Sequence, residues 1–455
     1  MTEIRKHKRL DGADISRLIE PENGRGHDAA GSGNSPSAPA VPVKRTNIPM
    51  VIMIFVMLVF GFIVLYSVSG PDAYGKYQDS AYFLRKQVVF TLLGLAGCFA
   101  ASFFPIKIFK LKGFMLLTYG MSFVLAVITL AFGSGAQEHG ATRWISIGGF
   151  QFQTSEVIKV ALILAFAGYR SMIDGMHRNG KLKAKTKSRQ ALMDTTFDFL
   201  IPVVAAVAVD LVIVLQPHVS CFIIIGIVIF MCALSSEIPL RSWVMGTAIL
   251  VIAAIVFALA AFMLAPSDKR DSFMKNYAHV FKRFEIFNAD ESGTDENTTI
   301  TEDDTRQVDN AFNALGSGGM WGVGLGNSRS KYNYVSEAQN DYIFSIYVEE
   351  TGFVGGVVLI MLYLVMLVMC LNVIWRADGI YMRTIATGCT TLIFIEVFLN
   401  MAVELQVIPS TGVTLPFVSY GGTAQIFLLL AYGLIMAVSR SGTRPAAPKK
   451  DQRKR

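Results

Sequence analysis

The chain has 455 residues, of which 53% are hydrophobic and only 16% are charged, and its formal net charge is +7. Soluble domains have about a quarter of their residues charged, so this composition excludes a water-soluble globule. The apolar residues form blocks of roughly 18 to 25 residues, the length of a helix that crosses about 30 Å of hydrocarbon. The sequence therefore predicts an all-α membrane protein, a polytopic bundle of about ten transmembrane helices with one long extracytoplasmic loop.

Residues 1–46 contain glycine, serine and proline among many charges and have no apolar run, so we expect a disordered cytoplasmic tail. A transmembrane domain follows at 47–440, and 441–455 form a basic cytoplasmic tail. The ten predicted spans are 48–69, 87–104, 114–133, 154–170, 197–216, 219–235, 241–264, 346–374, 382–404 and 423–439.

Lysines and arginines gather in the segments that are cytoplasmic if the N-terminus lies inside, above all in 178–189 and 449–455. This pattern satisfies the positive-inside rule. The longest loop, 265–341, is then outside and carries many acidic residues. The pattern predicts a multi-pass protein of the bacterial inner membrane with both termini in the cytoplasm. Attraction to anionic lipid accounts for the net positive charge of the chain, so we expect no nucleic-acid partner.

Four polar stretches interrupt the apolar pattern, and all are expected on the outer face. The first, 140–159, is an aromatic, glycine-containing re-entry that leads directly into a helix. Glu156 and Lys159 are three residues apart and therefore share a helix face. A charge pair at a membrane boundary normally points into the bundle or a wet cavity. A functional pair and a purely structural ion pair both stay open at this point.

The acidic loop is the second stretch, and the glycine run at 316–328 is the third. This run lacks the GxxxxGK[ST] pattern, which excludes a nucleotide P-loop, and a flexible turn stays open as its alternative. The fourth stretch, 409–423, contains two prolines and three glycines. Irregular backbone of this kind is tolerated at membrane depth only where protein or a water-filled cavity covers it.

Six polar side chains lie inside predicted spans, where they are costly and are therefore functional candidates by default. For the aspartate among them, a buried structural hydrogen bond is an equally open interpretation. The last three share one helix face at i, i+4 and i+8 spacing. The six residues are Asp210, Glu349, Glu350, Glu396, Asn400 and Glu404.

Taken together, these stretches resemble the SEDS family of division and elongation proteins, over nearly all of 48–440. Arg143 to Lys159 resembles the family's RWI…QPSE..K motif, and Thr411 to Gly422 matches TGxTLPFxSYGG. The segment 324–328, followed by Lys331, is closer to the division-type branch.

The chain also departs from the family pattern. His218 stands where the family's LQPD motif has its aspartate, and Thr154 replaces the proline of QPSE. An insertion lies between Phe284 and Gln307, in the region of the family's essential aspartate. Counting from Arg283 and Phe284 puts the expected catalytic base at Asp295, with Asp290 as runner-up. Asp303 and Asp304 follow as candidates, and simple solvation of an exposed loop is the alternative for each.

The resemblance implies a peptidoglycan glycosyltransferase that polymerises lipid II, releases undecaprenyl pyrophosphate and acts in septal cell-wall synthesis. Arg143 and Lys159 are then expected to bind the donor's pyrophosphate, with Glu156 orienting Lys159. A lipid II flippase and a non-catalytic scaffold are the alternative functions. The other expected substrate-binding residues are Gln153, Ser155, Ser419, Asn327 and Lys331.

The same resemblance implies the partners. A class B penicillin-binding transpeptidase is expected to act with the chain, together with other membrane proteins of the divisome at the division septum. All five cysteines lie in apolar blocks without a CxxC pair, which suggests neither disulfides nor a zinc site. No metal ligands are assigned, and a divalent cation, Mg²⁺ or Mn²⁺, stays open as a cofactor.

Overall fold

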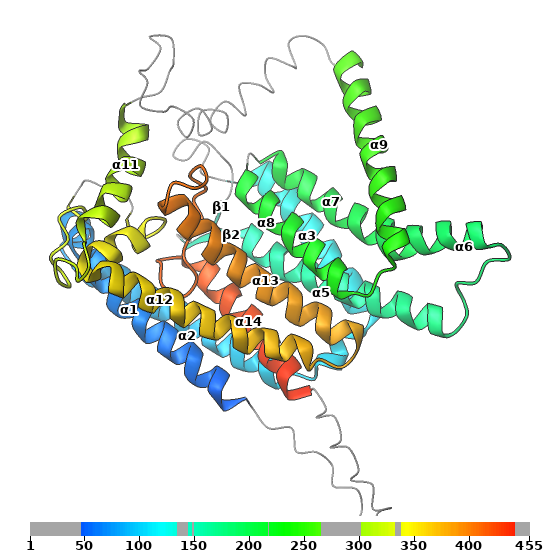
Figure 1. The fold of residues 1–455 in the computed structure, drawn as a ribbon, viewed down its shortest axis with the longest axis horizontal. Coiled ribbons are helices and arrows are strands. Elements are labelled where there is room, and N and C mark those ends of the chain that lie inside the picture. The colour runs from blue at the N-terminus through cyan, green and yellow to red at the C-terminus, as the bar shows by residue number, and fades with distance from the viewer. Residues whose placement is uncertain are drawn as a thin grey trace, which may run out of the picture. The chain divides into compact units, whose positions relative to one another are not determined.

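The computed structural model describes residues 47–133, 144–147, 150–216, 218–264, 302–332 and 338–441. These residues form an all-α bundle with one short hairpin (Figure 1). A helix lies at each of the ten predicted spans. The elements are α1 (Ile48–Tyr77), α2 (Tyr82–Phe103), η1 (Ile106–Lys110), α3 (Lys112–Phe132), β1 (Trp144–Ile147), β2 (Phe150–Gln153), α5 (Thr154–Arg178), α6 (Lys187–Asp194), η2 (Thr195–Leu200), α7 (Ile201–Val214), α8 (Val219–Ser235), α9 (Leu240–Leu264), α11 (Glu302–Ser317), α12 (Ile343–Trp375), α13 (Gly379–Glu404) and α14 (Thr423–Ser441).

Seven helical segments of the described chain are long and apolar enough to cross a membrane: α1, α2, α3, α6 to α7, α12, α13 and α14. Two shorter apolar helices, α8 and the first part of α9, accompany them. Within the most apolar window, 72% of α13 and 67% of α14 is buried, against 22% of α3. The chain is therefore a multi-pass membrane protein with α13 and α14 at its centre. The remaining predicted span, α5, has the charged residues Glu156, Lys159 and Arg170 among its buried side chains.

Small residues allow the central helices to approach each other closely. Gly433 of α14 faces the backbone of α2, where an added Cβ would lie only 2.4 Å from the carbonyl oxygen of Cys98. Gly388 of α13 faces α8 and α5 in the same way, 2.6 Å from Cys232 Sγ and 2.7 Å from Ile163. Lipid supplies no hydrophobic force between helices, so close packing of this kind holds a membrane bundle together.

An antiparallel hairpin precedes α5. Trp144 of β1 pairs with Gln153 of β2, and Ile147 pairs with Phe150. The ring of Phe152 packs edge-on at 6.2 Å from Phe427 of α14. The predicted re-entry therefore takes the form of a β-hairpin, which fixes where α5 begins.

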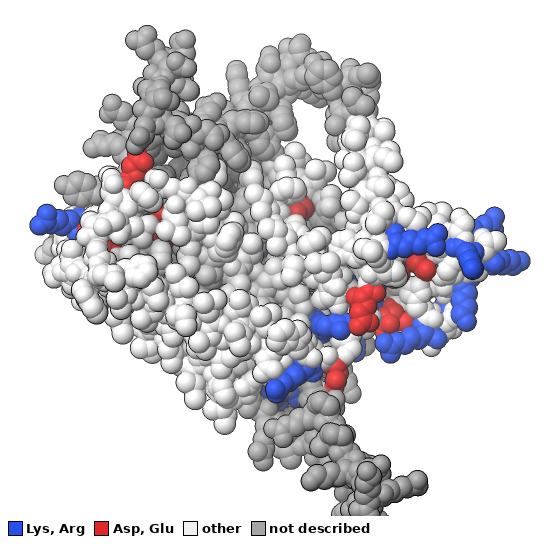
Figure 2. Space-filling model, viewed as in Figure 1, with Lys and Arg blue, Asp and Glu red and all other residues white. Residues whose placement is uncertain are grey.

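The two ends of the bundle differ in charge. Figure 2 shows lysine and arginine side chains gathered over α6 and the neighbouring helix ends. The opposite end carries the start of α12, α11 and the segment 405–422 that joins α13 to α14 (Figure 1). The described parts of the third and fourth polar stretches thus lie away from the basic end.

Candidate functional site

The start of α5 places a buried lysine between two carboxylates. Lys159 Nζ lies 2.8 Å from Glu156 Oε2, one helical turn away, and it also donates to Glu396 Oε1 of α13. The side chains are only 5%, 7% and 2% exposed for Lys159, Glu156 and Glu396 respectively. A buried charge is tolerated when it is paired, so the expected inward orientation of the Glu156–Lys159 pair is confirmed.

This group, Glu156, Lys159 and Glu396, is called the α5–α13 triad below. Among the described residues, Lys159 is the hydrogen-bond donor recorded for either glutamate side chain. One lysine cannot neutralise two ionised carboxylates or satisfy all of their lone pairs. The triad therefore retains capacity for a further donor or cation.

Two predicted site residues lie beside the triad. Ser155 is buried, and its hydroxyl has no hydrogen-bond partner among the described residues. The backbone N–H of Gln153 donates to the hydroxyl of Thr423, at 3.4 Å, where α14 begins. Buried hydroxyls are normally paired, so the Ser155 hydroxyl is suited to meet a bound polar group.

The glycine run docks onto a break in α12. Gly352 has φ +72° and interrupts the helix, and the N–H groups of Val323 and Gly324 donate to the carbonyl oxygens of Glu349 and Glu350 at 3.0 and 2.9 Å. A Cβ on Gly352 would lie 2.4 Å from the nitrogen of Gly322. These contacts hold the run against α12 through backbone hydrogen bonds.

A second buried lysine holds the end of that run. Lys331 Nζ lies 2.8 Å from Glu350 Oε1 and donates to the carbonyl oxygen of Ser67 in α1 at 3.2 Å. The Ser67 hydroxyl completes the ring by donating to Glu350 Oε2 at 2.5 Å. Every member of this network, called the Lys331 ring below, has a partner.

The neighbouring carboxylate is equally well satisfied. Glu349 accepts a hydrogen bond of 2.5 Å from the Ser328 hydroxyl and one of 3.1 Å from the N–H of Arg329. Asn327, by contrast, is exposed and donates to the carbonyl oxygen of Val323 at 3.3 Å. Within the described residues, no hydrogen bond or ion pair joins Lys331 or Asn327 to the α5–α13 triad. Lys331 therefore belongs to a separate network, and Asn327 bonds to the glycine run itself.

The segment between α13 and α14 is irregular and covered. Ser419 is 2% exposed; its hydroxyl accepts from the N–H of Leu415 at 2.9 Å, and its carbonyl oxygen accepts from Gln87 of α2 at 3.1 Å. Tyr363 of α12 donates to the carbonyl oxygen of Pro416 at 2.5 Å. Protein covers residues 415–419 of this segment, and the hydroxyl and carbonyl groups of Ser419 bond within it and to α2.

The three polar residues along α13 make different contacts. Glu396 joins the triad, and the Asn400 amide donates to two backbone carbonyl oxygens at 2.8 and 2.9 Å. Glu404 accepts from the N–H groups of Phe344 and Ser345, at 3.3 and 2.5 Å, and from the Ser345 hydroxyl at 2.6 Å. Glu404 thus caps the first turn of α12 and is a structural residue.

Comparison with known proteins agrees with this fold. The family of FtsW, RodA and SpoVE, described as cell cycle proteins, matches residues 48–444. The chain belongs to this family, the SEDS proteins. A relative in Trichlorobacter lovleyi, named probable peptidoglycan glycosyltransferase FtsW, is 27% identical over 86% of this chain and 93% of its own length. Stage V sporulation protein E of Bacillus subtilis is 29% identical over 87% of this chain and 98% of its own length.

Two solved structures share the fold. One is a chain of a peptidoglycan synthase complex that coordinates polymerization and crosslinking, with a TM-score of 0.62, 22% identity and coverage of 88% of this chain and 99% of that chain. The other is the rod shape determining protein RodA of Thermus thermophilus, with a TM-score of 0.56, 22% identity and coverage of 88% and 98%. The all-α polytopic architecture predicted from the sequence is thus confirmed as a SEDS fold.

Several predicted site residues fall outside the described part of this SEDS chain. They are Arg143 and the loop aspartates Asp290 and Asp295. Asp303 and Asp304 lie in α11, where only the backbone is described. The expected roles of these residues remain predictions. The sequence did not predict that Glu396 pairs with Lys159. The available signal was the position of Glu396 inside a predicted span.

One group of described residues has a spacing that could suit a metal ion. The ligand atoms of His177, Asp194 and Asp198, from the ends of α5 and α6 and from η2, lie within 4.8 Å of one another. However, Arg170 Nη1 already lies 2.7 Å from Asp198 Oδ1, and Gln190 donates to Asp194 at 2.6 Å. A resident guanidinium disfavours a divalent ion at this position because the two positive charges repel each other.

Proposed function

We propose that the chain is a SEDS peptidoglycan glycosyltransferase that polymerises lipid II into glycan strands and releases undecaprenyl pyrophosphate. The family match and the full-length relatives named peptidoglycan glycosyltransferases support this function. The observation that carries it to particular residues is the α5–α13 triad, a buried and incompletely satisfied charge cluster at the start of α5.

The chemistry needs a base and positive charge. A sugar hydroxyl attacks the anomeric carbon of the donor and loses its proton to a nearby base. The bond from that carbon to the pyrophosphate breaks, and cations stabilise the negative charge on the leaving group. Lys159 can supply a point charge, and Arg143 a bidentate guanidinium. Both substrates carry a long lipid, so a site within a helical bundle lets them enter from the bilayer.

The triad imposes a condition on this mechanism. With both Glu156 and Glu396 ionised, Lys159 lies in a cluster of net negative charge, which repels a pyrophosphate. Binding therefore needs additional positive charge, from Arg143 or a divalent ion, or the release of Glu396 from Lys159. We propose that Glu156 holds Lys159 in position, while Glu396 competes with the pyrophosphate for the ammonium group.

For the base we retain Asp295, with Asp290 as runner-up and Asp303 or Asp304 as further candidates. A carboxylate with an ordinary pKa of about 4 is ionised at neutral pH and can accept the hydroxyl proton without special tuning. The test is lipid II polymerisation by the four single aspartate-to-asparagine variants, each checked for membrane insertion. Wild-type turnover by Asp295→Asn would refute this assignment, and wild-type turnover by all four would place the base elsewhere.

One experiment separates the proposed function from its alternatives. Labelled lipid II is supplied to the purified chain, with and without a class B penicillin-binding transpeptidase, in detergent and in sealed vesicles. A polymerase extends glycan strands in both preparations, whereas a flippase moves lipid II across the vesicle bilayer without polymerising it. A scaffold does neither, and any strand growth then requires a separate polymerase.

We further propose that the basic end near α6 faces the cytoplasm, with both termini on that side and the acidic loop outside. This orientation follows the positive-inside rule. A class B penicillin-binding transpeptidase and other divisome proteins are the proposed partners at the septum, and the relative from a synthase complex supports a transpeptidase. The outer loop would face that partner. Deleting the insertion before Gln307 should weaken co-purification with the transpeptidase and its stimulation of polymerisation. Unchanged co-purification and stimulation would show that the insertion is passive.

A further inference from the structure

Large apolar side chains are exposed along the glycine run, with exposed fractions between 45% and 78%. They belong to Met320, Trp321, Val323 and Leu325 and are called the apolar edge below. From Trp321 onward the large residues alternate with glycines of positive φ. A Cβ on the first of these glycines would overlap the carbonyl oxygen of Glu350. The backbone therefore lies directly against α12, while the large side chains stay uncovered by the described residues.

Two helices indicate where the apolar edge lies across the membrane. The N–H of Gly326 donates to the Ser67 hydroxyl at 3.1 Å, and Ser67 is about 28 Å along α1 from Ile48 at 1.5 Å per residue. The run also packs on Gly352, which is about 35 Å along α12 from Trp375. Neither stretch of helix contains a charged residue. Both lengths match the roughly 30 Å of hydrocarbon, so the apolar edge lies at one of its boundaries.

The apolar edge continues the lipid-facing surface of α12. The N–H of Phe353 donates to the carbonyl oxygen of Gly319 at 2.8 Å, which joins the run to this helix. Phe353, Val357 and Met361 are all exposed and share one helix face. On a spanning helix, a continuous apolar surface of this kind faces lipid. Tryptophan favours the boundary itself because its ring is apolar and its N–H is polar, and exposed Trp375 lies at the other end of α12.

We propose that the apolar edge is an interfacial anchor, which inserts between the headgroups and the acyl chains of one phospholipid leaflet. In the orientation proposed above, this is the outer leaflet. The occupant is lipid, because the edge is continuous with a lipid-facing surface and burial of its large side chains is favourable. Since the run bonds to α1 and α12, the anchor would hold the Lys331 ring at a fixed level in the membrane. It would do so whether or not the chain polymerises lipid II.

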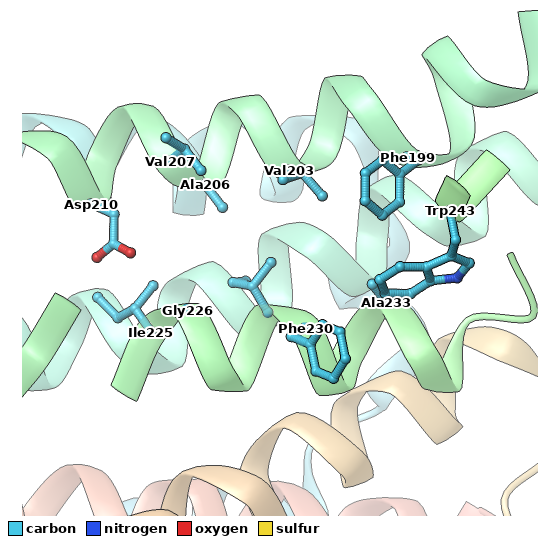
Figure 3. Close-up of a pocket in the computed structure, with 11 residues that line it drawn as sticks. Phe199, Val203, Ala206, Val207, Asp210, Ile225, Gly226, Phe230, Ala233 and Trp243 are labelled. Atoms are coloured by element: carbon cyan, nitrogen blue, oxygen red, sulfur yellow. The ribbon is translucent and has the colours of Figure 1, made fainter. Parts of the chain in front are cut away.

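The test uses Trp321 as a reporter of depth. Replacing Trp144, Trp243 and Trp375 with Phe leaves it as the only tryptophan, since the chain has 4. Trp243 has to be replaced because it lines an apolar groove between α7, α8 and the start of α9, where it would report on other lipid chains. Figure 3 shows this groove, with Trp243 at one end and Asp210 at the other.

The single-tryptophan chain is placed in nanodiscs of phosphatidylcholine whose bromines lie either near the headgroup or near the end of the acyl chain. Bromine quenches a nearby indole. We expect the shallow bromines to remove at least about twice as much Trp321 emission as the deep ones, because interfacial rings lie at headgroup level. Iodide in the water should quench Trp321 less than it quenches free tryptophan. A variant that retains only Trp375 is the control for the opposite boundary and should show the same depth preference.

Hydrogen exchange tests whether the anchor holds the run. The N–H groups of Val323 and Gly324 bond to α12, so their exchange rates report on docking of the run. Trp321→Ser combined with Leu325→Ser should speed this exchange at least about tenfold in nanodiscs, because burial of the two side chains in lipid is lost. Phe312→Ser is the matched control, because Phe312 is exposed on α11 outside the apolar edge, and it should leave the exchange unchanged.

Three outcomes would overturn the proposal. Strong quenching by iodide without quenching by brominated lipid would place the edge in water, and protection on adding a transpeptidase would then assign the edge to that partner. Stronger quenching by the deep bromines would place the edge inside the hydrocarbon core. Unchanged exchange in the double variant, or equal acceleration by Phe312→Ser, would show that the edge does not hold the run.

Discussion

Lys159 and Lys331 are both buried beside glutamates, yet their surroundings differ. The carboxylate groups around Lys331 also accept from Ser67, Ser328 and the N–H of Arg329, so hydroxyl and backbone donors complete the network. The two glutamates at Lys159 have that lysine as their recorded partner within the described chain. A network in which every polar group has a hydrogen-bond partner stabilises the fold. A network with unpaired acceptor groups can also bind a ligand. Burial and charge alone do not distinguish the two.

The largest effect is expected for Lys159→Ala. It leaves Glu156 and Glu396 buried without a cation, which costs about 3–5 kcal/mol of stability, and it should lower lipid II polymerisation at least about a hundredfold. Adding Glu156→Gln and Glu396→Gln removes the unpaired charges and should restore the melting temperature without restoring polymerisation. If the triple variant regains activity, Lys159 acts only through stability and the distinction from Lys331 disappears.

Lys331→Met breaks the saturated network. It leaves Glu350 unpaired in the interior, so we expect a loss of about 3–5 kcal/mol and a lower melting temperature. The double variant Lys331→Met, Glu350→Gln should recover most of that stability, with polymerisation close to wild type. A stable but inactive double variant would instead assign Lys331 to the substrate site, as the sequence predicted.

Gly352→Ala disturbs the break in α12 against which the glycine run packs. The new Cβ meets the nitrogen of Gly322 at 2.4 Å and the residue keeps φ +72°, so strain and overpacking together should cost about 2–4 kcal/mol. Gly319→Ala is the matched control, because Gly319 has φ +54° but open space, and only about 1–2 kcal/mol of strain applies. Chemical or thermal unfolding in detergent measures both, and equal losses would show that the docked glycine run adds no stability.

The smallest effect concerns two glutamates on one face of α13. Glu404→Gln replaces one of the two acceptor oxygens that cap α12 with an NH2 group, which faces a hydrogen-bond donor, so about 1–3 kcal/mol of stability should be lost with the KM for lipid II unchanged. Glu396→Gln should lower that KM, since it removes the carboxylate that competes for Lys159. Steady-state polymerisation together with melting curves compares them, and an altered KM in Glu404→Gln alone would reverse the two roles.

The sequence by itself determined the ten helical segments, because each apolar block is matched to the thickness of hydrocarbon regardless of its neighbours. It also determined the Glu156–Lys159 pair, which the helical repeat places on one face. The burial of residues 415–419 agrees with the cost of unpaired backbone in lipid. These are local properties, set by residues close together in the chain.

Only the tertiary structure decided which buried polar residues meet. Glu396 reaches Lys159 across 237 positions of sequence, Glu404 caps α12, and Lys331 closes a ring with Ser67 of α1. Glu396 and Glu404 satisfied the same sequence rule, that polar groups inside spans are candidates for function, whereas Lys331 lies outside the predicted spans and was picked out by the family resemblance. Their roles diverge because helix faces in lipid are matched by close packing and specific hydrogen bonds between distant segments, which the apolar pattern of a single helix does not encode.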